Sequence, residues 1–261
     1  MRYIDIHCHL TDEKFSPDLH EVIGRMREKE VHTITVGCDL VSSQAAVAVA
    51  DEFSEVFACI GQHPVDNRDE VFDGDTYAAL AANEKVVAIG ECGLDYYRGA
   101  DSGEKKRQKE LFELQIVFAI EHNLPLMLHG RPQKGTMDAY EDMLDILESS
   151  AKTAPTLRGN AHFFVGDIDI ARRFLASNFT MSFAGPITFA PEYEEVVRFV
   201  PLDMMHAETD SPYAPPAEYR GKRNEPSFVP EIVNALARIK NHSDEEVREV
   251  LLQNAIRVFG L

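Results

Sequence analysis

The chain has 261 residues, of which 44% are hydrophobic and 27% charged, a balance typical of globular proteins that excludes a disordered chain, a collagen and a coiled coil. Acidic residues outnumber basic ones by 44 to 26, and the formal charge of −18 opposes binding to nucleic acid or an anionic membrane through bulk electrostatics. No apolar run approaches the ~18 residues of a membrane span, the first residues do not resemble a signal peptide, and the four cysteines form no C-x-x-C pair. We therefore expect a cytoplasmic protein with reduced thiols, no membrane partner and no obligate protein partner, for which a monomer suffices.

Short apolar runs rich in isoleucine and valine alternate with longer segments of helical periodicity. The runs predict eight strands, at 3–7, 31–36, 56–61, 86–90, 125–129, 157–162, 179–183 and 204–208. The other segments predict helices at 18–29, 42–53, 74–83, 104–122, 138–149, 167–176, 191–198 and 228–240, with a ninth at 243–258. This order favours an α/β protein, a single (β/α)8 TIM barrel over residues 1–261 with an extra C-terminal helix. An open doubly wound sheet is the alternative, but no G-x-G-x-x-G sequence follows the first strand.

The segment 104–122 has the clearest helical pattern. We expect Ser102 to cap it, and we expect Ser243 with Glu246 to form a capping box at the start of the ninth helix. After the charged first turn of segment 104–122, the apolar residues of this segment predict one broad buried stripe. They are Leu111, Leu114, Ile116, Val117, Phe118 and Ile120.

Histidines and carboxylates recur where the predicted strands end. In the first strand, alternation places Asp5, His7 and His9 on one face, and Ile6 and Cys8 on the other. The C-terminal ends of barrel strands form one rim, so we expect the polar residues of the other strand ends to join these histidines there. Those residues are His63, Glu91, His129, His162, Glu208 and Asp210.

Six of these side chains have the mixed nitrogen and oxygen chemistry of a site for divalent metal ions, with Mg²⁺, Mn²⁺ and Zn²⁺ all left open. Six ligands are too many for one tetrahedral ion, so they predict two ions. Glu91 lies between the two groups in barrel order, which makes it the candidate bridge. The predicted ligands are His7, His9, Glu91, His129, His162 and Asp210.

The ordered motifs resemble the TatD family of metal-dependent deoxyribonucleases, within the amidohydrolase-like barrels, over essentially the whole chain. The resemblance implies a TIM barrel with a divalent-metal centre that hydrolyses phosphodiester bonds in DNA, often as a 3′–5′ exonuclease. The matching segments are 5–9, 61–64, 90–95, His129 with Arg131, 162–166, 208–213, 223–226 and 254–260.

The resemblance assigns the metal role to the six predicted ligands and a phosphate-side role to His63. Glu208 would support the metal or the substrate, and Asp5 would orient a ligating histidine. In the implied mechanism the ions activate a water, and Glu91 is catalytic because it bridges those ions. Asp210 accepts the proton from the water, and His63 donates to a phosphate oxygen or to the leaving group.

Two segments depart from the family pattern. Residues 163–167 begin with two phenylalanines and a valine where the family commonly has small or hydroxyl residues, and the stretch 132–136 is longer than usual. Both lie near the expected substrate mouth, so we expect them to bear on substrate preference and not on the metal centre.

A DNA substrate requires local positive charge on this acidic chain. We expect basic rim residues to form a mouth that binds single strands or ends, and tyrosines to stack on unpaired bases. These basic residues are Arg98, Arg131, Lys134, and those of segments 105–109 and 220–223; the tyrosines are Tyr96, Tyr97 and Tyr219.

The same ligands leave other functions open. A metal-activated water also attacks carbonyl groups, so an amide or ester hydrolase, such as an aminoacyl-tRNA deacylase or a small-molecule amidohydrolase, is the alternative enzyme. A metal-bearing scaffold without activity would predict a missing ligand, and all six are present.

Overall fold

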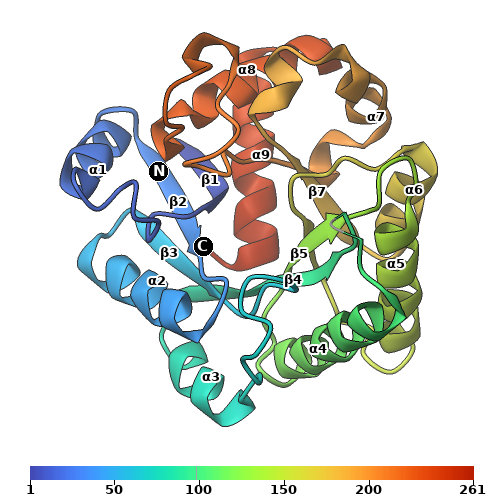
Figure 1. The fold of residues 1–261 in the computed structure, drawn as a ribbon. Coiled ribbons are helices and arrows are strands. Elements are labelled where there is room, and N and C mark those ends of the chain that lie inside the picture. The colour runs from blue at the N-terminus through green and yellow to red at the C-terminus, as the bar shows by residue number, and fades with distance from the viewer. Residues whose placement is uncertain (98) are drawn as a thin grey trace.

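The computed structural model describes residues 1–97 and 99–261, so Arg98, which we expect at the mouth, lies outside the described residues. Eight parallel strands follow one another in the order β1 to β8 around a nearly closed barrel, and helices surround them (Figure 1). The predicted (β/α)8 barrel with an extra C-terminal helix is thereby confirmed. Among the described residues, no helix combines the length and apolar character that crossing a membrane requires.

The elements lie close to their predicted positions. The largest difference is that the fourth strand continues past residue 90, so Glu91 lies within it. The strands are β1 (Tyr3–Cys8), β2 (Val31–Val36), β3 (Val56–Ile60), β4 (Val86–Asp95), β5 (Leu126–Arg131), β6 (Gly159–Ala161), β7 (Phe179–Phe183) and β8 (Met205–Ala207). The α-helices are α1 (Leu19–Glu28), α2 (Leu40–Glu52), α3 (Gly74–Ala81), α4 (Ser102–Glu121), α5 (Asp138–Ala151), α6 (Ile168–Ala176), α7 (Glu194–Phe199), α8 (Val229–Lys240) and α9 (Asp244–Phe259). Short 3-10 helices are η1 (Gly185–Thr188), η2 (Pro191–Tyr193), η3 (Leu202–Met204), η4 (Ala217–Tyr219) and η5 (Pro226–Phe228).

The barrel closes between β1 and the chain that follows β8. The backbone N–H of Asp210 donates to the carbonyl of His7 at 2.9 Å, and the N–H of His9 donates to the carbonyl of Ser211 at 2.7 Å. Cys8 and Ser211 form the matching parallel bridge. Because these bonds join the ends of the first and last strands, they bring Asp210 next to the histidines of β1.

Buried side chains form one cluster on each face of the sheet. The larger cluster lies between the strands and the surrounding helices. The smaller one combines interior strand residues such as Ile6 and Met127 with α9 residues such as Phe259. The side-chain amide of Asn254 on α9 donates to the carbonyl of Met205, the first residue of β8. Helix α9 therefore covers the N-terminal end of the barrel, inside the ring of the other helices (Figure 1).

The strict alternation predicted for the first strand is wrong at its end. Ile6 packs in the barrel interior, whereas Cys8 belongs to the outer cluster. The pairing of β1 with β2 shifts register between Asp5 and Cys8, and such an irregularity re-aims side chains. As a result the Nε2 atoms of His7 and His9 face each other 3.2 Å apart.

Helix α4 buries half of the predicted stripe, Leu111, Ile116 and Phe118, together with polar residues that the pattern did not predict. The glutamines Gln108 and Gln115 are buried and bond to the backbone of strand ends. Gln108 accepts from the N–H of Asp95 and donates to its carbonyl, and Gln115 does the same for Gln62. These bonds hold the chain where β4 and β3 end, beside the site. Three predicted stripe residues are exposed instead: Leu114, Val117 and Ile120.

The start of α4 also differs from the prediction. Its cap is Asp101, whose carboxylate accepts from the N–H of Glu104, while Ser102 is the first residue of the helix. A carboxylate there is further favoured by the helix dipole. At the start of α9, Ser243 accepts from the N–H of Glu246, which is one half of the predicted capping box.

Candidate metal centre

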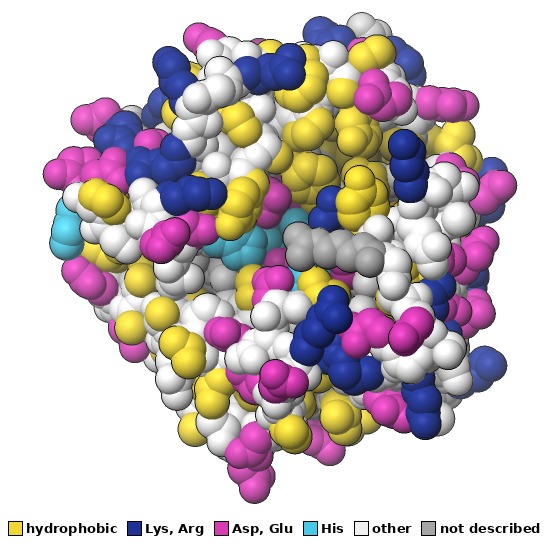
Figure 2. All heavy atoms as spheres, in the orientation of Figure 1, with side chains coloured by type: hydrophobic (Ala, Val, Ile, Leu, Met, Phe, Trp, Pro, Cys, Tyr) yellow, Lys and Arg dark blue, Asp and Glu magenta, His cyan; other side chains and the backbone are white. Residues whose placement is uncertain are grey.

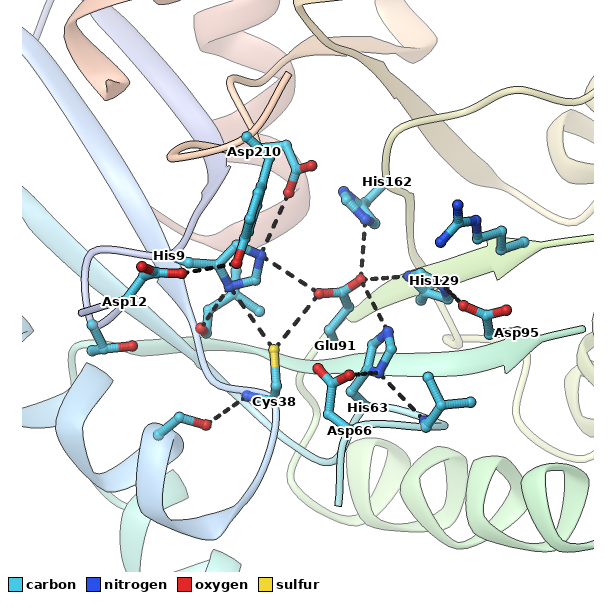
Figure 3. Close-up of a pocket in the computed structure, with 16 residues that line it drawn as sticks. His9, Asp12, Cys38, His63, Asp66, Glu91, Asp95, His129, His162 and Asp210 are labelled. Carbon is cyan, nitrogen blue, oxygen red and sulfur yellow. Dashed lines mark hydrogen bonds and ion pairs between the residues drawn. The ribbon is translucent and has the colours of Figure 1, made fainter. Parts of the chain in front are cut away.

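Glu91 occupies the middle of the rim, with His9 on one side and His129 and His162 on the other (Figure 3). His7 pairs with His9. Its Oε2 atom lies 3.5 Å from Nε2 of His7 and 3.8 Å from Nε2 of His9. Its Oε1 atom lies 2.6 Å from Nδ1 of His129 and 3.1 Å from Nε2 of His162. One carboxylate oxygen therefore faces each pair, the arrangement expected of a residue that bridges two ions.

Two further carboxylates contact the histidines of the second pair. Nε2 of His129 lies 3.3 Å from Asp95 at the end of β4, and Nδ1 of His162 lies 3.1 Å from Oε1 of Glu208. The other oxygen of Glu208 accepts from the hydroxyl of Ser182 at 2.5 Å. Contacts of this kind decide which ring nitrogen keeps a lone pair for a metal. Glu208 is fully buried and lies behind His162, where it supports that ring.

The electrostatics of the centre call for added positive charge. Burial alone would raise the pKa of Glu91, but the charge and hydrogen bonds of His162 and His129 hold it well below its usual range. Burial opposes protonation of His129, yet hydrogen bonds to Asp95 and Glu91 raise its pKa to about 9. The pKa of His162 is likewise raised against the effect of burial, by Glu208 and Glu91. Each of these nitrogen–oxygen contacts favours a cation between the two atoms, either a proton or a metal ion.

The donor atoms fit divalent metal ions in kind and in placement. His7, His9 and Glu91 place three donor atoms within 4.8 Å of one another. Glu91, His129 and His162 form a second group of the same kind. Imidazole nitrogen and carboxylate oxygen are ligands that Zn²⁺ and Mn²⁺ accept. The facing Nε2 atoms of His7 and His9 are an arrangement that one shared cation satisfies.

The centre lies on the floor of a pocket of about 580 Å³, which opens at the hollow seen in Figure 2. Among its described lining residues, Arg131 is the one lysine or arginine. When the histidines are neutral, as metal-bound imidazoles are, five carboxylates against one guanidinium leave a surplus of four negative charges, which two divalent ions would offset. The five carboxylates are Asp12, Asp66, Glu91, Asp95 and Asp210.

Asp210 reaches the centre from a loop in which its own φ is 53°. Its Oδ1 atom lies 3.4 Å from Nε2 of His9 and 3.7 Å from Nε2 of His7. Asp5, expected to orient a ligating histidine, accepts from the backbone N–H of His7 at 3.3 Å and from the N–H and hydroxyl of Thr209 at 2.8 and 2.6 Å. Its contact with His7 is thus to the backbone and not to the imidazole ring. Asp5 therefore holds the residue next to Asp210.

Asn224 holds the same loop from its other side. Its side-chain amide donates to the carbonyls of Thr209 and Tyr213 at 2.7 and 2.6 Å. The neighbouring Arg223 bonds to the carboxylate of Asp18 at 2.6 Å. This part of the 223–226 motif thus anchors the chain that carries Asp210.

His63 lies beside the centre, with its Nε2 atom 3.9 Å from Oε1 of Glu91. Its Nδ1 atom lies 3.2 Å from Asp66, and this hydrogen bond keeps the pKa of Asp66 below its usual value despite partial burial. With Asp95 and His129 it forms another group of donors within 4.8 Å. Its ring meets that of His129 edge to face at 4.4 Å.

Sequence reasoning missed several polar residues of this pocket, among them Cys38, Asp66 and Asp95. The thiol of Cys38 lies 3.9 Å from both His9 and Glu91, and burial raises its pKa to about 11, so it is neutral. The signal for Cys38 was its place just after the second strand, on the same rim. Asp95 lies in a matched motif, but its contact with a histidine of the next strand has no signature in sequence.

The basic mouth expected from segment 105–109 is not formed. Lys105 and Lys109 pair with Asp138 and Asp142 of α5, each at 2.8 Å, and Arg107 pairs with a carboxylate one turn earlier. Figure 2 shows lysines and arginines interspersed with acidic residues around the hollow. These cations are therefore largely neutralised within the chain and offer little to a polyanion.

The tyrosines also differ from the prediction. Tyr96 is fully buried and its hydroxyl donates to Asp142 at 2.9 Å, so it cannot stack on a base. Tyr219 stacks on a phenylalanine of η5 at 3.7 Å. Tyr97 is half exposed and lies 4.0 Å from the guanidinium of Arg131. Of the predicted substrate contacts, Arg131 and Tyr97 stay available at the mouth. Within the described part of the chain no salt bridge neutralises three further predicted cations, which are exposed: Lys134, Arg220 and Lys222.

Metal-ligand groups at the C-terminal rim of a (β/α)8 barrel define the class of metal-dependent barrel hydrolases. The model of the TatD related DNase family matches residues 4–260, and the chain belongs to this family, as its motifs predicted. It is 40% identical to the uncharacterized metal-dependent hydrolase YabD of Bacillus subtilis over 98% of each chain. It is 34% identical to the uncharacterized metal-dependent hydrolase YcfH of Escherichia coli K12, over 100% of this chain and 97% of that one. The crystal structure of YJJV, a TatD homologue of E. coli K12, matches with a TM-score of 0.89 and 26% identity over 100% of this chain and 98% of that one.

Proposed function

We propose that this TatD-family hydrolase cleaves phosphodiester bonds in DNA, as a 3′–5′ exonuclease on single strands or strand ends. We further propose that it uses two divalent ions, Mg²⁺, Mn²⁺ or Zn²⁺. The observation that carries the proposal is the placement of Glu91, with one oxygen toward each histidine pair. A pair of ions held by a shared carboxylate suits in-line displacement at phosphorus.

Each proposed ligand has a place in this scheme. Ions bound here would acidify a water and neutralise charge on the phosphate oxygens. Burial would raise the pKa of Asp210, but its hydrogen bond to His9 and nearby histidine charges lower it, so the carboxylate is ionised at neutral pH and accepts the proton. His7, His9 and Asp210 would hold one ion, His129 and His162 would hold the other, and Glu91 would contribute an oxygen to each.

Two residues outside the ligand set act on the substrate. His63 faces the pocket with Nε2 and donates a hydrogen bond to a phosphate oxygen or to the leaving group. Arg131 presents the one guanidinium of the described pocket lining, and a guanidinium binds phosphate with two parallel hydrogen bonds.

The test is cleavage of single-stranded DNA labelled at its 3′ or 5′ end, with Mg²⁺, Mn²⁺ or Zn²⁺ added. We expect stepwise shortening from the 3′ end, which EDTA and Glu91→Ala both abolish. Glu55→Ala is the matched control, because Glu55 pairs with Arg27 next to β3, at the other end of the barrel. Asp210→Asn should keep metal and lose turnover. Uncut DNA despite measured metal occupancy would refute the proposal.

A second candidate is a metal-dependent amide or ester hydrolase, such as an aminoacyl-tRNA deacylase or a small-molecule amidohydrolase. The acidic pocket and the paired cations of α4 favour the small-molecule amidohydrolase of the two, because they suit a substrate with little negative charge, whereas tRNA is a polyanion. The same preparations should be assayed on aminoacylated tRNA and on small amides. Metal-dependent cleavage of one of these, with DNA left intact, would replace the first proposal.

A further inference from the structure

A second pocket, of about 390 Å³, adjoins the metal centre on the side of β5 and β6. We call it the apolar pocket and define it by Gly130, Phe163, Val165 and Ala214. Its volume lies within the range of small-molecule sites. In Figure 2 hydrophobic side chains gather beside the central hollow. The sequence had marked residues 163–167 as a departure from the family pattern, and this pocket is where that departure lies.

The pocket is continuous with the proposed reaction site. It shares the candidate ligands His129, His162 and Asp210 with the larger pocket, and Arg131 lines both. The ring of Phe163 lies 6.0 Å from that of His162. A group bound in the apolar pocket would therefore lie beside the groups that react at the metal centre.

The backbone around the pocket is held in an unusual conformation. Among the described residues, seven besides glycine have positive φ, and four of them follow helix ends. The other three all line the apolar pocket: Phe163 (45°), Asp210 (53°) and Ala214 (48°). Left-handed backbone at such residues costs free energy and is concentrated at functional sites.

Neighbouring residues maintain these conformations. The N–H of Phe163 donates to the buried carboxylate of Glu208 at 2.7 Å. Gly185 accommodates the loop of Ala214, because a Cβ at position 185 would lie 2.1 Å from the carbonyl oxygen of Ala214. The shape of the pocket is thus built into the rim of the barrel.

The charge of the pocket indicates what it binds. Apart from the shared ligands and Arg131, its lining offers aromatic, aliphatic and backbone surface with no charge. An uncharged flat ring attached to a phosphate matches this combination, because the ring can stack on Phe163 while the phosphate meets Arg131 and the metals. Resting on the proposed function, we propose that the apolar pocket binds the nucleobase of the nucleotide whose phosphodiester bond is cleaved.

The test is a mutant cycle on the enzyme and its substrate. Labelled single-stranded oligonucleotides would carry either a normal thymidine or a tetrahydrofuran abasic residue at the reacting end, with both ends tested. Phe163→Ala should lower kcat/KM about tenfold for the normal end and less than about twofold for the abasic end. Phe163→Tyr, which keeps the ring, should retain the preference for the base. An equal loss on both substrates, or no loss, would overturn the proposal.

A binding measurement separates this proposal from the nuclease assignment. Calorimetry on metal-loaded protein would compare thymidine 5′-monophosphate with 2-deoxyribose 5-phosphate, which lacks the base. We expect the nucleotide to bind about tenfold more tightly, and Phe163→Ala to remove the difference. If DNA is not cleaved but this difference holds, the nuclease function fails and the pocket stands; equal binding of both ligands refutes the pocket.

The matched control is Phe189→Ala. Phe189 is an exposed aromatic residue 4.6 Å from the guanidinium of Arg220, and it lines neither pocket. We expect this variant to change none of the measurements by more than about twofold. A loss as large as that of Phe163→Ala would show a general effect of rim aromatics and would also overturn the proposal.

Discussion

Replacing Glu208 by glutamine tests whether the barrel interior sets the metal affinity of the rim. Both oxygens of this buried carboxylate are in use: Oε1 lies 3.1 Å from Nδ1 of His162 and accepts from the N–H of Phe163, and Oε2 accepts from Ser182. While Oε1 accepts from Nδ1, the lone pair of Nε2 points toward Glu91 and the metals. Glu208→Gln keeps the shape and one acceptor but removes the negative charge.

The expected magnitude follows from the position of Glu208 behind His162. Loss of a carboxylate that orients a metal-bound histidine lowers metal affinity by about 10- to 100-fold, equivalent to about 1.4–2.7 kcal/mol. Ser182→Ala should cost less, because it leaves the charge of Glu208 and its contact with His162 in place. We therefore expect the order Glu208→Gln, then Ser182→Ala, then wild type, from weakest to tightest metal binding.

Calorimetric titration of metal-free protein with Mn²⁺ or Zn²⁺ measures the affinity of each of the proposed binding events. Glu55→Gln is the control, since Glu55 is also a largely buried carboxylate but pairs with Arg27 far from the rim. Thermal unfolding of each variant shows whether the fold is kept. Affinities of Glu208→Gln within about twofold of wild type, or an equal loss in Glu55→Gln, would refute the argument.

Three further predictions concern stability and charge. His206 is fully buried, and burial lowers its pKa to about 3, whereas the unfolded chain titrates near 6.5. Only the unfolded chain therefore gains this proton as pH falls from 8 to 5, so wild type should lose about 2 kcal/mol more of its unfolding free energy than His206→Gln; parallel curves from urea unfolding would contradict this. Asn224→Ala removes the side-chain donor to one buried and one partly buried carbonyl and should lower the unfolding free energy by roughly 1–3 kcal/mol, and a loss below about 0.5 kcal/mol in urea titrations would argue against this role of Asn224. Arg131→Ala should reduce the salt dependence of oligonucleotide binding, as a log–log slope, by about 1, while Lys105→Ala leaves it unchanged because Lys105 is already paired; equal slopes in fluorescence anisotropy for the two variants would show that the pairing is irrelevant.

The fold could be predicted because each of its layers has its own periodicity in sequence. Eight apolar runs and nine helical segments in strict order leave few alternatives to a parallel barrel, and the model confirms that order. What failed were details that depend on contacts across elements. The face on which the side chains of the first strand lie depended on a register shift in β1. The buried face of α4 depended on Gln108 and Gln115, whose side chains hydrogen-bond the backbone where β4 and β3 end.

The candidate site shows the same division. Motif position at strand ends was enough to bring His7, Glu91 and Asp210 together on one rim. The contacts of Asp95 and Glu208 could not be predicted in the same way, because each is with a histidine of another strand. The supporting role of Glu208 was implied by the family resemblance and not by its position. Whether these residues bind metal and act in catalysis stays a prediction until the variants above are measured.

The distribution of charge determines how this acidic chain would bind the proposed phosphate substrate. Because the rim lysines Lys105 and Lys109 are paired, the positive charge that meets a phosphate must come from bound ions and Arg131. At physiological salt, charges more than about 8 Å apart are largely screened, so further phosphates along a strand gain little from this centre. Stacking of one base, worth about 1–3 kcal/mol, is then a larger source of affinity than additional phosphates. A hydrolase with this distribution of charge is suited to binding the last nucleotide of a strand. Stacking of a base on Phe163 would supply the affinity that a basic groove supplies in enzymes that bind long DNA.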